Sequence, residues 1–380
     1  MRRRAPVPVS VFVLSLALAL AVAPGCGGHR GTDAAPPGDA GTDAGGNVVV
    51  DGPVDLTGTF IAVGRISVLV TTLPTSSLIP TQVLDTLQVT LTDYAQTGTT
   101  LTANTTLCNV VLPKPRIIDA NNPSSAQIGV RFGDALRAYL DAGNISITSM
   151  GPFLSGTEIS GGVPLDYMGS RDVFVLGASF DPGVDAETAA LPVINVATDG
   201  TGNEIVTITE PAGTHWEDTE GDVCPGLVVD MMSAGDPCPG VTVTCDGSGC
   251  TNPAVTSLLP SSEQVAFRAA FTLRGSVYSS NSLGGEVYNP VNTQELLGFT
   301  LEPAQTLSAQ TVVDNIPRIE VCSGQPECVA AAATSTWLAV RVDGTNGSLN
   351  ADADASGAVS CSEALLFLDD NPELFGIAGN

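Results

Sequence analysis

The sequence predicts a mainly β fold, an antiparallel β-barrel or sandwich that carries a short C-terminal helix. Apolar and polar residues alternate with period two in many short runs, and these runs are rich in Thr, Val and Ile. Turn-forming pairs such as Asp-Gly, Gly-Gly and Asn-Pro separate the runs. Many short strands with polar connections favour an antiparallel sheet over βαβ units. An apolar content of 43% indicates a sizeable core.

Residues 1–25 have the layout of a bacterial secretory signal. Three arginines precede an uncharged apolar run at 9–23, which is too short to span a membrane comfortably. Cys26 follows in the sequence APGC, which resembles the lipobox of bacterial lipoproteins, where the cysteine becomes lipidated. The match departs from the lipobox at Ala23, where Leu is usual. We therefore expect a lipid anchor at the outer membrane, cell surface or periplasm, with cleavage after Ala23 and secretion as the alternative.

Residues 26–52 are expected to form a disordered tether behind the lipidated cysteine. Gly, Ala, Pro, Asp and Thr dominate the stretch, and the tetrapeptide GTDA occurs at 31–34 and again at 41–44. Such a composition offers little to pack, so the segment would hold the folded part away from the membrane.

Residues 53–345 are expected to form the β domain, and residues 346–380 a C-terminal appendage. In the run at 87–92, Leu87, Val89 and Leu91 alternate with Gln and Thr, which is typical of a strand with one face in water. Further strands are predicted at 66–70, 99–112, 144–149, 172–179, 204–209, 240–245 and 265–278. Helices are predicted at 133–142 and 362–369.

The cysteines indicate an oxidising compartment. The chain has 9 cysteines, and setting Cys26 aside for lipid leaves an even number suited to disulfides. Zinc is disfavoured because the clusters lack C-x-x-C spacing and the chain has only 2 histidines. Many pairings are open. Short spacing favours the bridges Cys245–Cys250 and Cys322–Cys328, Cys224–Cys238 is a third candidate, and Cys108–Cys361 then remains as a long-range bridge.

The charge balance excludes one class of partner. The chain has 14 Lys and Arg against 40 Asp and Glu, a net charge of −26, so we expect no nucleic-acid binding. An acidic surface is compatible with divalent cations, and it also serves solubility alone.

Several segments together are similar to uncharacterised lipoproteins of GC-rich Gram-negative bacteria. The resemblance lies in the tether, in DLTGTF at 55–60, in RDVFVLGASFDP at 171–182 and in the acidic turn that begins at Asp218 and ends in Cys-Pro-Gly. It supports the expected address and fold and implies no activity.

Residues 352–363, DADASGAVSCSE, match the EF-hand calcium loop. Calcium takes six to eight hard oxygens, which alternate side chains of a tight loop can deliver around one point. Gly357 stands where the loop turns sharply, and a helix follows, as in the family. The expected ligands are Asp352, Asp354, Ser356, the carbonyl of Ala358, Ser360 through water and Glu363 as a bidentate ligand.

The loop departs from a complete EF-hand on its N-terminal side. Residues 337–342 predict a strand and 343–350 a turn, so no incoming helix is expected. The nearer resemblance is to dockerin-like loop–helix sites of extracellular bacterial proteins, which implies a structural Ca²⁺ ion. The alternative is a solvated acidic turn whose Glu363 caps the helix.

The acidic run HWEDTEGD at 215–222 is a weaker cation candidate. Asp218, Glu220 and Asp222 alternate there, but no position-12 ligand follows, so a solvated turn is favoured. His215 is the only histidine beyond the tether, and the chain lacks G-x-S-x-G, H-E-x-x-H and P-loop sequences.

We therefore expect a surface lipoprotein that is not an enzyme and acts in binding or envelope structure. One alternative is a carrier that holds an apolar ligand inside a barrel. The other is a secreted hydrolase that uses paired carboxylates, which meet only in space.

Overall fold

The computed structural model describes residues 48–71, 80–113, 115–117, 126–233, 245–246, 249–250, 262–300 and 308–377. Strands make up 54% and helices 12%, so the predicted mainly β class is confirmed. The signal, Cys26 and the tether up to residue 47 lie outside the described residues, as does most of the strand predicted at 240–245.

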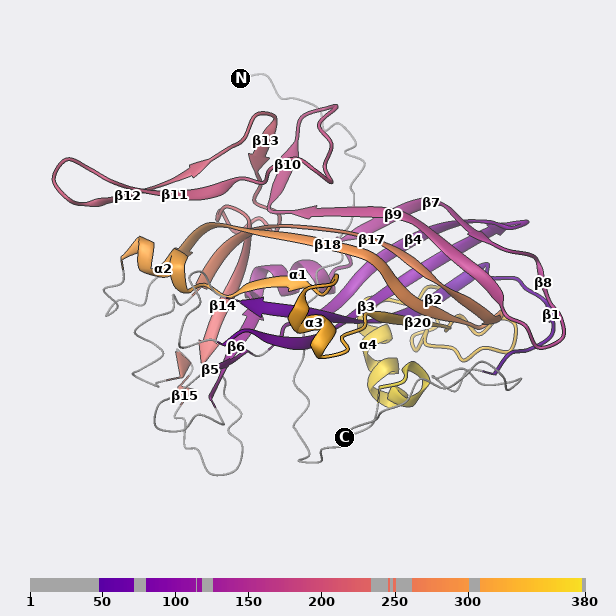
Figure 1. Ribbon diagram of the computed structural model, residues 1–380. Coiled ribbons are helices and arrows are strands. Elements are labelled where there is room, and N and C mark those ends of the chain that lie inside the picture. The colour runs from indigo at the N-terminus through magenta and orange to yellow at the C-terminus, as the bar shows by residue number, and fades with distance from the viewer. Residues whose placement is uncertain are drawn as a thin grey trace, which may run out of the picture.

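The main sheet closes on itself in chain order (Figure 1). Each strand of the ring pairs with the next in antiparallel fashion, and β18 pairs with both β17 and β20. Its members are β2 (Gly58–Thr71), β3 (Gln82–Thr97), β4 (Thr100–Val111), β7 (Ser146–Leu154), β9 (Leu165–Leu176), β17 (Ser262–Ser279), β18 (Ser282–Thr300) and β20 (Thr336–Arg341). The expected barrel-or-sandwich class is thus realised as a barrel-like ring.

Further strands branch from the ring. The first part of β17 pairs with β14 (Leu227–Ser233), which continues into β6 (Ala126–Phe132) and β5 (Arg116–Ile117). Its later part pairs with β9. On the other side, β19 (Arg318–Val321) pairs with the end of β2.

Smaller elements lie outside the closed ring (Figure 1). Two hairpin-like pairs are β10 (Ala178–Phe180) with β13 (Thr214–Trp216) and β11 (Val193–Thr198) with β12 (Glu204–Thr209). The remaining elements are β15 (Cys245–Asp246), β16 (Gly249–Cys250), α2 (Ala309–Asn315) and α3 (Pro326–Ala330).

The folded part begins before residue 53. The Val50 N–H donates to the Tyr278 carbonyl at 2.9 Å, and β1 (Gly52–Pro53) pairs with β8 (Glu158–Ile159). Val49 packs against the core of the ring. The last residues of the expected tether are therefore fixed to the β domain.

The core occupies both faces of the ring wall. Inside, α1 (Asp134–Asp141) packs Leu136 and Leu140 against side chains of β4, β7, β9 and β17. Outside, α4 (Cys361–Asp370) and η1 (Pro372–Phe375) cover β2, β3 and β4. Both predicted helices, at 133–142 and 362–369, are thereby confirmed.

The expectation that one face of the run at 87–92 lies in water is wrong. Its apolar residues pack under α4, while Gln88, Thr90 and Thr92 point into the ring and are buried. The polar face is buried because ring closure encloses it. Period-two alternation distinguishes the two faces of a strand but does not show which face meets water.

Among the helices of the described residues, none combines the length and the apolar character that crossing a membrane requires.

Candidate metal centre and interior cavity

A buried arginine fixes the start of the C-terminal segment. Arg341, at the end of β20, is 0% exposed, and its guanidinium donates to the carbonyls of Thr57 and Ser280. Its Nη1 also lies 3.4 Å from Asp343 Oδ2. Burial lowers the pKa of Arg341, and the carboxylate of Asp343 opposes that effect. The contacts of Arg341 therefore fix the position at which the C-terminal segment leaves β20.

The segment then turns back and is tied to the ring at its far end. An isolated bridge joins Asp343 to Asn350, and the Ala351 N–H donates to the Val342 carbonyl at 2.8 Å. The disulfide Cys108–Cys361 links β4 to the first residue of α4 and confirms the expected long-range bridge. The loop at 352–360 is thus held between two fixed ends.

Three carboxylates of the expected calcium ligands converge. One oxygen from each of Asp352, Asp354 and Glu363 lies within 4.8 Å of the other two. Calcium–oxygen bonds of about 2.3–2.6 Å place opposed oxygens around one ion up to about 5 Å apart. The donor set and its spacing therefore fit a Ca²⁺ ion.

Backbone N–H groups of the loop donate hydrogen bonds to the carboxylates of Asp352 and Asp354. Asp352 accepts hydrogen bonds from the N–H groups of Ser356 at 3.0 Å and Gly357 at 2.8 Å. Asp354 accepts from the Ser356 N–H at 2.9 Å. Gly357 adopts φ of +90°, so the expected sharp turn occurs at loop position 6, where glycine has the least strain.

Glu363 joins the two ends of the loop. Its Oε1 accepts from the N–H groups of Ala353 at 2.9 Å and Asp354 at 3.2 Å. Its Oε2 accepts from the Ser360 N–H at 2.8 Å and from the Ser360 hydroxyl at 2.7 Å. These contacts, with the Ser360 N–H first, lower the pKa of Glu363 to about 2. The carboxylate is therefore charged and aimed at the loop centre.

The remaining expected ligands divide into two groups. The Ser356 hydroxyl donates to the Ala358 carbonyl at 3.0 Å, so loop positions 5 and 7 adjoin each other. Ser360 instead forms the N-terminal capping box of α4 with Glu363. Its hydroxyl is engaged at the helix start, so any contribution to an ion would pass through water.

The acidic run at 215–222 forms a turn that its own backbone satisfies. Asp218 accepts from the N–H groups of Gly221 at 2.7 Å, Asp222 at 3.1 Å and Val223 at 2.9 Å. Glu220 accepts from the Val228 N–H at 2.7 Å, and burial raises its pKa to about 7. In the described part of the chain, these carboxylates do not join the converging group of the C-terminal loop.

His215 lies between two exposed carboxylates. Its Nδ1 is 3.4 Å from Glu210 Oε2, and its Nε2 is 3.6 Å from Asp181 Oδ1. The ring is half exposed at the β10–β13 pair. This arrangement gives the half-exposed histidine two carboxylate neighbours at the surface.

The other cysteine expectations have separate outcomes. The Cys322–Cys328 bridge is formed. Cys224 is a free thiol, and Cys238 lies outside the described residues. Cys245 and Cys250 stand opposite each other in the β15–β16 register.

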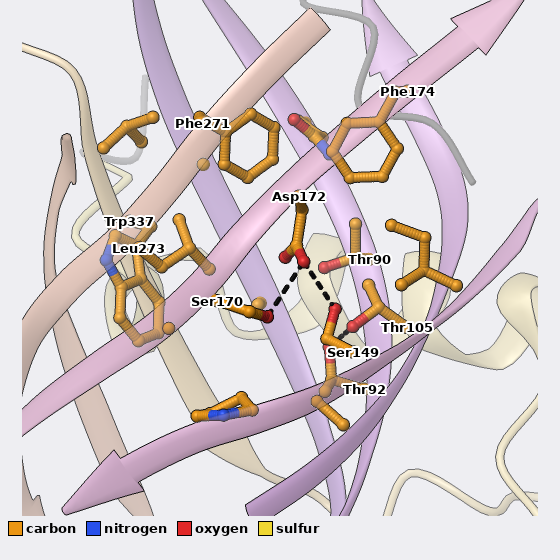
Figure 2. A pocket seen from close by; sticks show the side chains of 18 of the residues that line it. Thr90, Thr92, Thr105, Ser149, Ser170, Asp172, Phe174, Phe271, Leu273 and Trp337 are labelled. Carbon is orange, nitrogen blue, oxygen red and sulfur yellow. Dashed lines mark hydrogen bonds between the residues drawn. The ribbon is translucent and has the colours of Figure 1, made fainter. Parts of the chain in front are cut away.

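Sequence reasoning did not find a cavity inside the ring, a mostly apolar space with several polar side chains in its walls. The cavity has a volume of about 70 Å³, and its walls carry Gln88, Thr90, Asp172 and several aromatic rings. Asp172 Oδ1 accepts from the Ser149 hydroxyl at 2.8 Å and the Ser170 hydroxyl at 3.0 Å (Figure 2). Burial raises the pKa of Asp172. The only sequence signal was an acidic residue within the strand RDVFVL, which alternation alone does not place inside.

Comparisons of the chain with family models, with curated proteins and with solved structures gave no match. The functional argument therefore depends on the geometry of the chain itself.

Proposed function

We propose that this chain is a surface-anchored bacterial lipoprotein whose disulfide-linked β domain carries a structural Ca²⁺ site and acts in binding or envelope structure. The observation that carries the proposal is the convergence of Asp352, Asp354 and Glu363 at loop positions 1, 3 and 12. The lipid anchor would sit at Cys26, ahead of the folded part.

The donor chemistry favours calcium over transition metals. Every candidate ligand is an oxygen atom, from carboxylates, a hydroxyl and a carbonyl. Hard oxygen ligands suit Ca²⁺, whereas zinc and copper prefer nitrogen and sulfur. The strongly acidic chain adds a general attraction for divalent cations.

A structural ion fits this loop better than a sensory one. The loop is already folded by its own hydrogen bonds and is held between the Asp343–Asn350 bridge and the Cys108–Cys361 disulfide. Because its ends are fixed, ion binding would stabilise α4 on the ring rather than move a helix. Extracellular sites of this kind bind with Kd on the order of 10⁻⁴–10⁻³ M.

The carrier of an apolar ligand has less support than a binding or structural role. The cavity of about 70 Å³ is small, and although most of its lining is apolar, Gln88, Thr90 and Asp172 also line it. An apolar ligand would leave these polar groups without water or partners, which costs free energy.

The test is a calcium titration of the purified chain and of the Glu363→Gln variant. Glutamine keeps the capping box but removes the bidentate charge, so helix α4 stays capped. At 10 mM Ca²⁺ and a Kd of about 10⁻⁴ M, we expect stabilisation by about 2.7 kcal/mol in the parent and little in the variant. Thermal unfolding followed by circular dichroism measures both.

The matched control is Glu373→Gln, which removes an exposed carboxylate on η1 outside the loop. This variant should respond to Ca²⁺ like the parent. A parent chain whose unfolding temperature does not move with Ca²⁺ would contradict the metal site, and an equal gain in Glu363→Gln would place the ion elsewhere.

A further inference from the structure

The wall of the ring opens between β7 and β9, beside the interior cavity. The two strands pair only at Phe153 with Met168 and Leu154 with Tyr167. Continued in the same register, Ser149 would stand opposite Asp172, and there the Ser149 hydroxyl donates to the carboxylate at 2.8 Å. A side-chain hydrogen bond thus spans the strands where the backbone ladder is missing.

Local sequence explains why the ladder ends there. Pro152 has no N–H to donate, and Gly151 adopts φ of +111°, which bends β7 away from an extended course. Gly169 on β9 faces the backbone of Leu273. A Cβ added to Gly169 would lie 3.0 Å from the Leu273 carbonyl oxygen, so the site has no room for a side chain. Pro152 and Gly169 both line the cavity, so the cavity adjoins the opening.

The cavity contains polar groups that the described protein leaves without partners. Gln88 and Thr90 are 7% and 8% exposed and line the cavity, yet no described residue hydrogen-bonds to either side chain. Asp172 uses Oδ1 for both serine contacts, and no described residue donates to its Oδ2. Their polar atoms face the cavity, where water or a bound ligand can supply the hydrogen bonds.

The charge of Arg171 lowers the pKa of Asp172, but its guanidinium makes its hydrogen bonds to other groups. The adjacent Arg171 turns to the outside, where its guanidinium pairs with Glu187 at 2.7 Å and donates to the Asn289 carbonyl at 2.6 Å. An anionic or apolar occupant would give the free Oδ2 of this partly buried carboxylate no favourable contact. A cation would.

The aromatic lining of the cavity favours an organic cation. The rings of Phe174, Phe271 and Trp337 surround the space above and beside Asp172 (Figure 2). Aromatic faces attract cations and also accommodate a short carbon chain. A divalent metal prefers several charged oxygens, and this cavity has one carboxylate.

We propose that the cavity binds a small primary ammonium ion. Its N–H groups would donate to Asp172 Oδ2, the Gln88 amide oxygen and the Thr90 hydroxyl, and its carbon atoms would lie against Phe271 and Trp337. A volume of about 70 Å³ restricts the ligand to a few heavy atoms, on the size scale of ethylammonium. This site is separate from the calcium loop, which lies on the outer side of the ring wall.

The test is a fluorescence titration of the full-length chain with ethylammonium chloride. The chain has 2 tryptophans, and a Trp216→Phe background leaves Trp337 in the cavity wall as the reporter. We expect a saturable change in Trp337 emission that is absent with sodium chloride at equal ionic strength and with ethanol. An equal response to sodium chloride or to ethanol would overturn the proposal, because neither is an ammonium ion.

Two variants test whether ethylammonium binds in the cavity, and a third tests whether this binding is independent of the calcium loop. Asp172→Asn should weaken ethylammonium binding at least tenfold, and Thr90→Val, which keeps the side-chain shape, should weaken it several-fold. Glu363→Gln should leave the affinity unchanged, so failure here is independent of the calcium result. Parent-like affinity in Asp172→Asn, or in Thr90→Val if the first variant does not fold, would contradict the proposal.

Discussion

At the residue scale, Gly58 and Arg341 determine how the C-terminal segment leaves the ring. Gly58 adopts φ of +147°, and a Cβ there would lie 2.0 Å from Asp343 Oδ2 and 2.4 Å from Arg341 Nη1. The glycine of DLTGTF thus leaves room for the buried guanidinium and its carboxylate. Gly58 is the first residue of β2, and this close approach is the physical reason for a glycine there.

Gly58→Ala should destabilise the chain markedly. The methyl group meets the Arg341–Asp343 pair, and the backbone is strained for any L side chain, so we expect a loss of about 2–4 kcal/mol. Gly200→Ala is the control, since nothing lies within 4 Å of its added Cβ and its φ is not in the positive region. Urea unfolding measures both, and equal effects in the two variants would contradict the steric account.

Glu263 makes stability depend on pH. Its side chain is 3% exposed, its Oε1 lacks a partner in the described protein, and burial raises its pKa to about 8. A folded-state pKa above the unfolded value means that the native state holds the proton longer, so stability falls as pH rises from about 4.5 to about 8. The expected slope is about −1.4 kcal/mol per pH unit within that window.

Glu263→Gln should remove that part of the slope, whereas Glu158→Gln, at an exposed position of β8, should retain it. Urea unfolding at several pH values between 5 and 8 is the measurement. A variant whose stability falls with pH as steeply as the parent would show that another group is responsible.

At the scale of elements, the two disulfides differ in what they constrain. Cys108–Cys361 closes a sequence separation of 253 residues, whereas Cys322–Cys328 closes one of 6. The chain-entropy model assigns about 5 kcal/mol to the first and about 2 kcal/mol to the second. The long bridge also joins α4 to β4, beside the calcium loop.

Replacing Cys108 and Cys361 by alanine should therefore cost about 3 kcal/mol more than replacing Cys322 and Cys328. It should also weaken the Ca²⁺ response, because one end of the loop is released. Urea unfolding without reductant, with and without Ca²⁺, compares the two double variants. Equal losses would show that the long bridge does not restrain the unfolded chain.

The same elements show how far the sequence could predict the site. EF-hand spacing located the carboxylates of Asp352, Asp354 and Glu363, because ligands from one short loop are fixed by local sequence. The cavity could not be located in this way, because Gln88 and Asp172 come from strands far apart in the chain and meet only after ring closure. Ser360, which was expected to contribute through water, forms the capping box of α4, a role that its place three residues before Glu363 also predicts.

At the scale of the whole molecule, the chain is strongly acidic and is also expected to be attached to a membrane. The net charge of −26 gives the chain no attraction to anionic head groups. Among the described residues, no helix is suited to cross a membrane. The proposed lipid on Cys26 would supply attachment, with residues 26–47 between the lipid and the first residues fixed to the ring.

Replacing Cys26 by serine should release the chain from the membrane fraction. The lipid supplies the proposed attachment, and membrane affinity rises by about 0.8 kcal/mol for each buried methylene of an acyl chain. Fractionation of expressing cells, with the mass of the N-terminal peptide, measures attachment and modification together. Cys224→Ser is the matched control, because Cys224 is a free thiol in the folded part and should not affect attachment. A parent chain in the medium with an unmodified Cys26 would instead support cleavage after Ala23 and secretion.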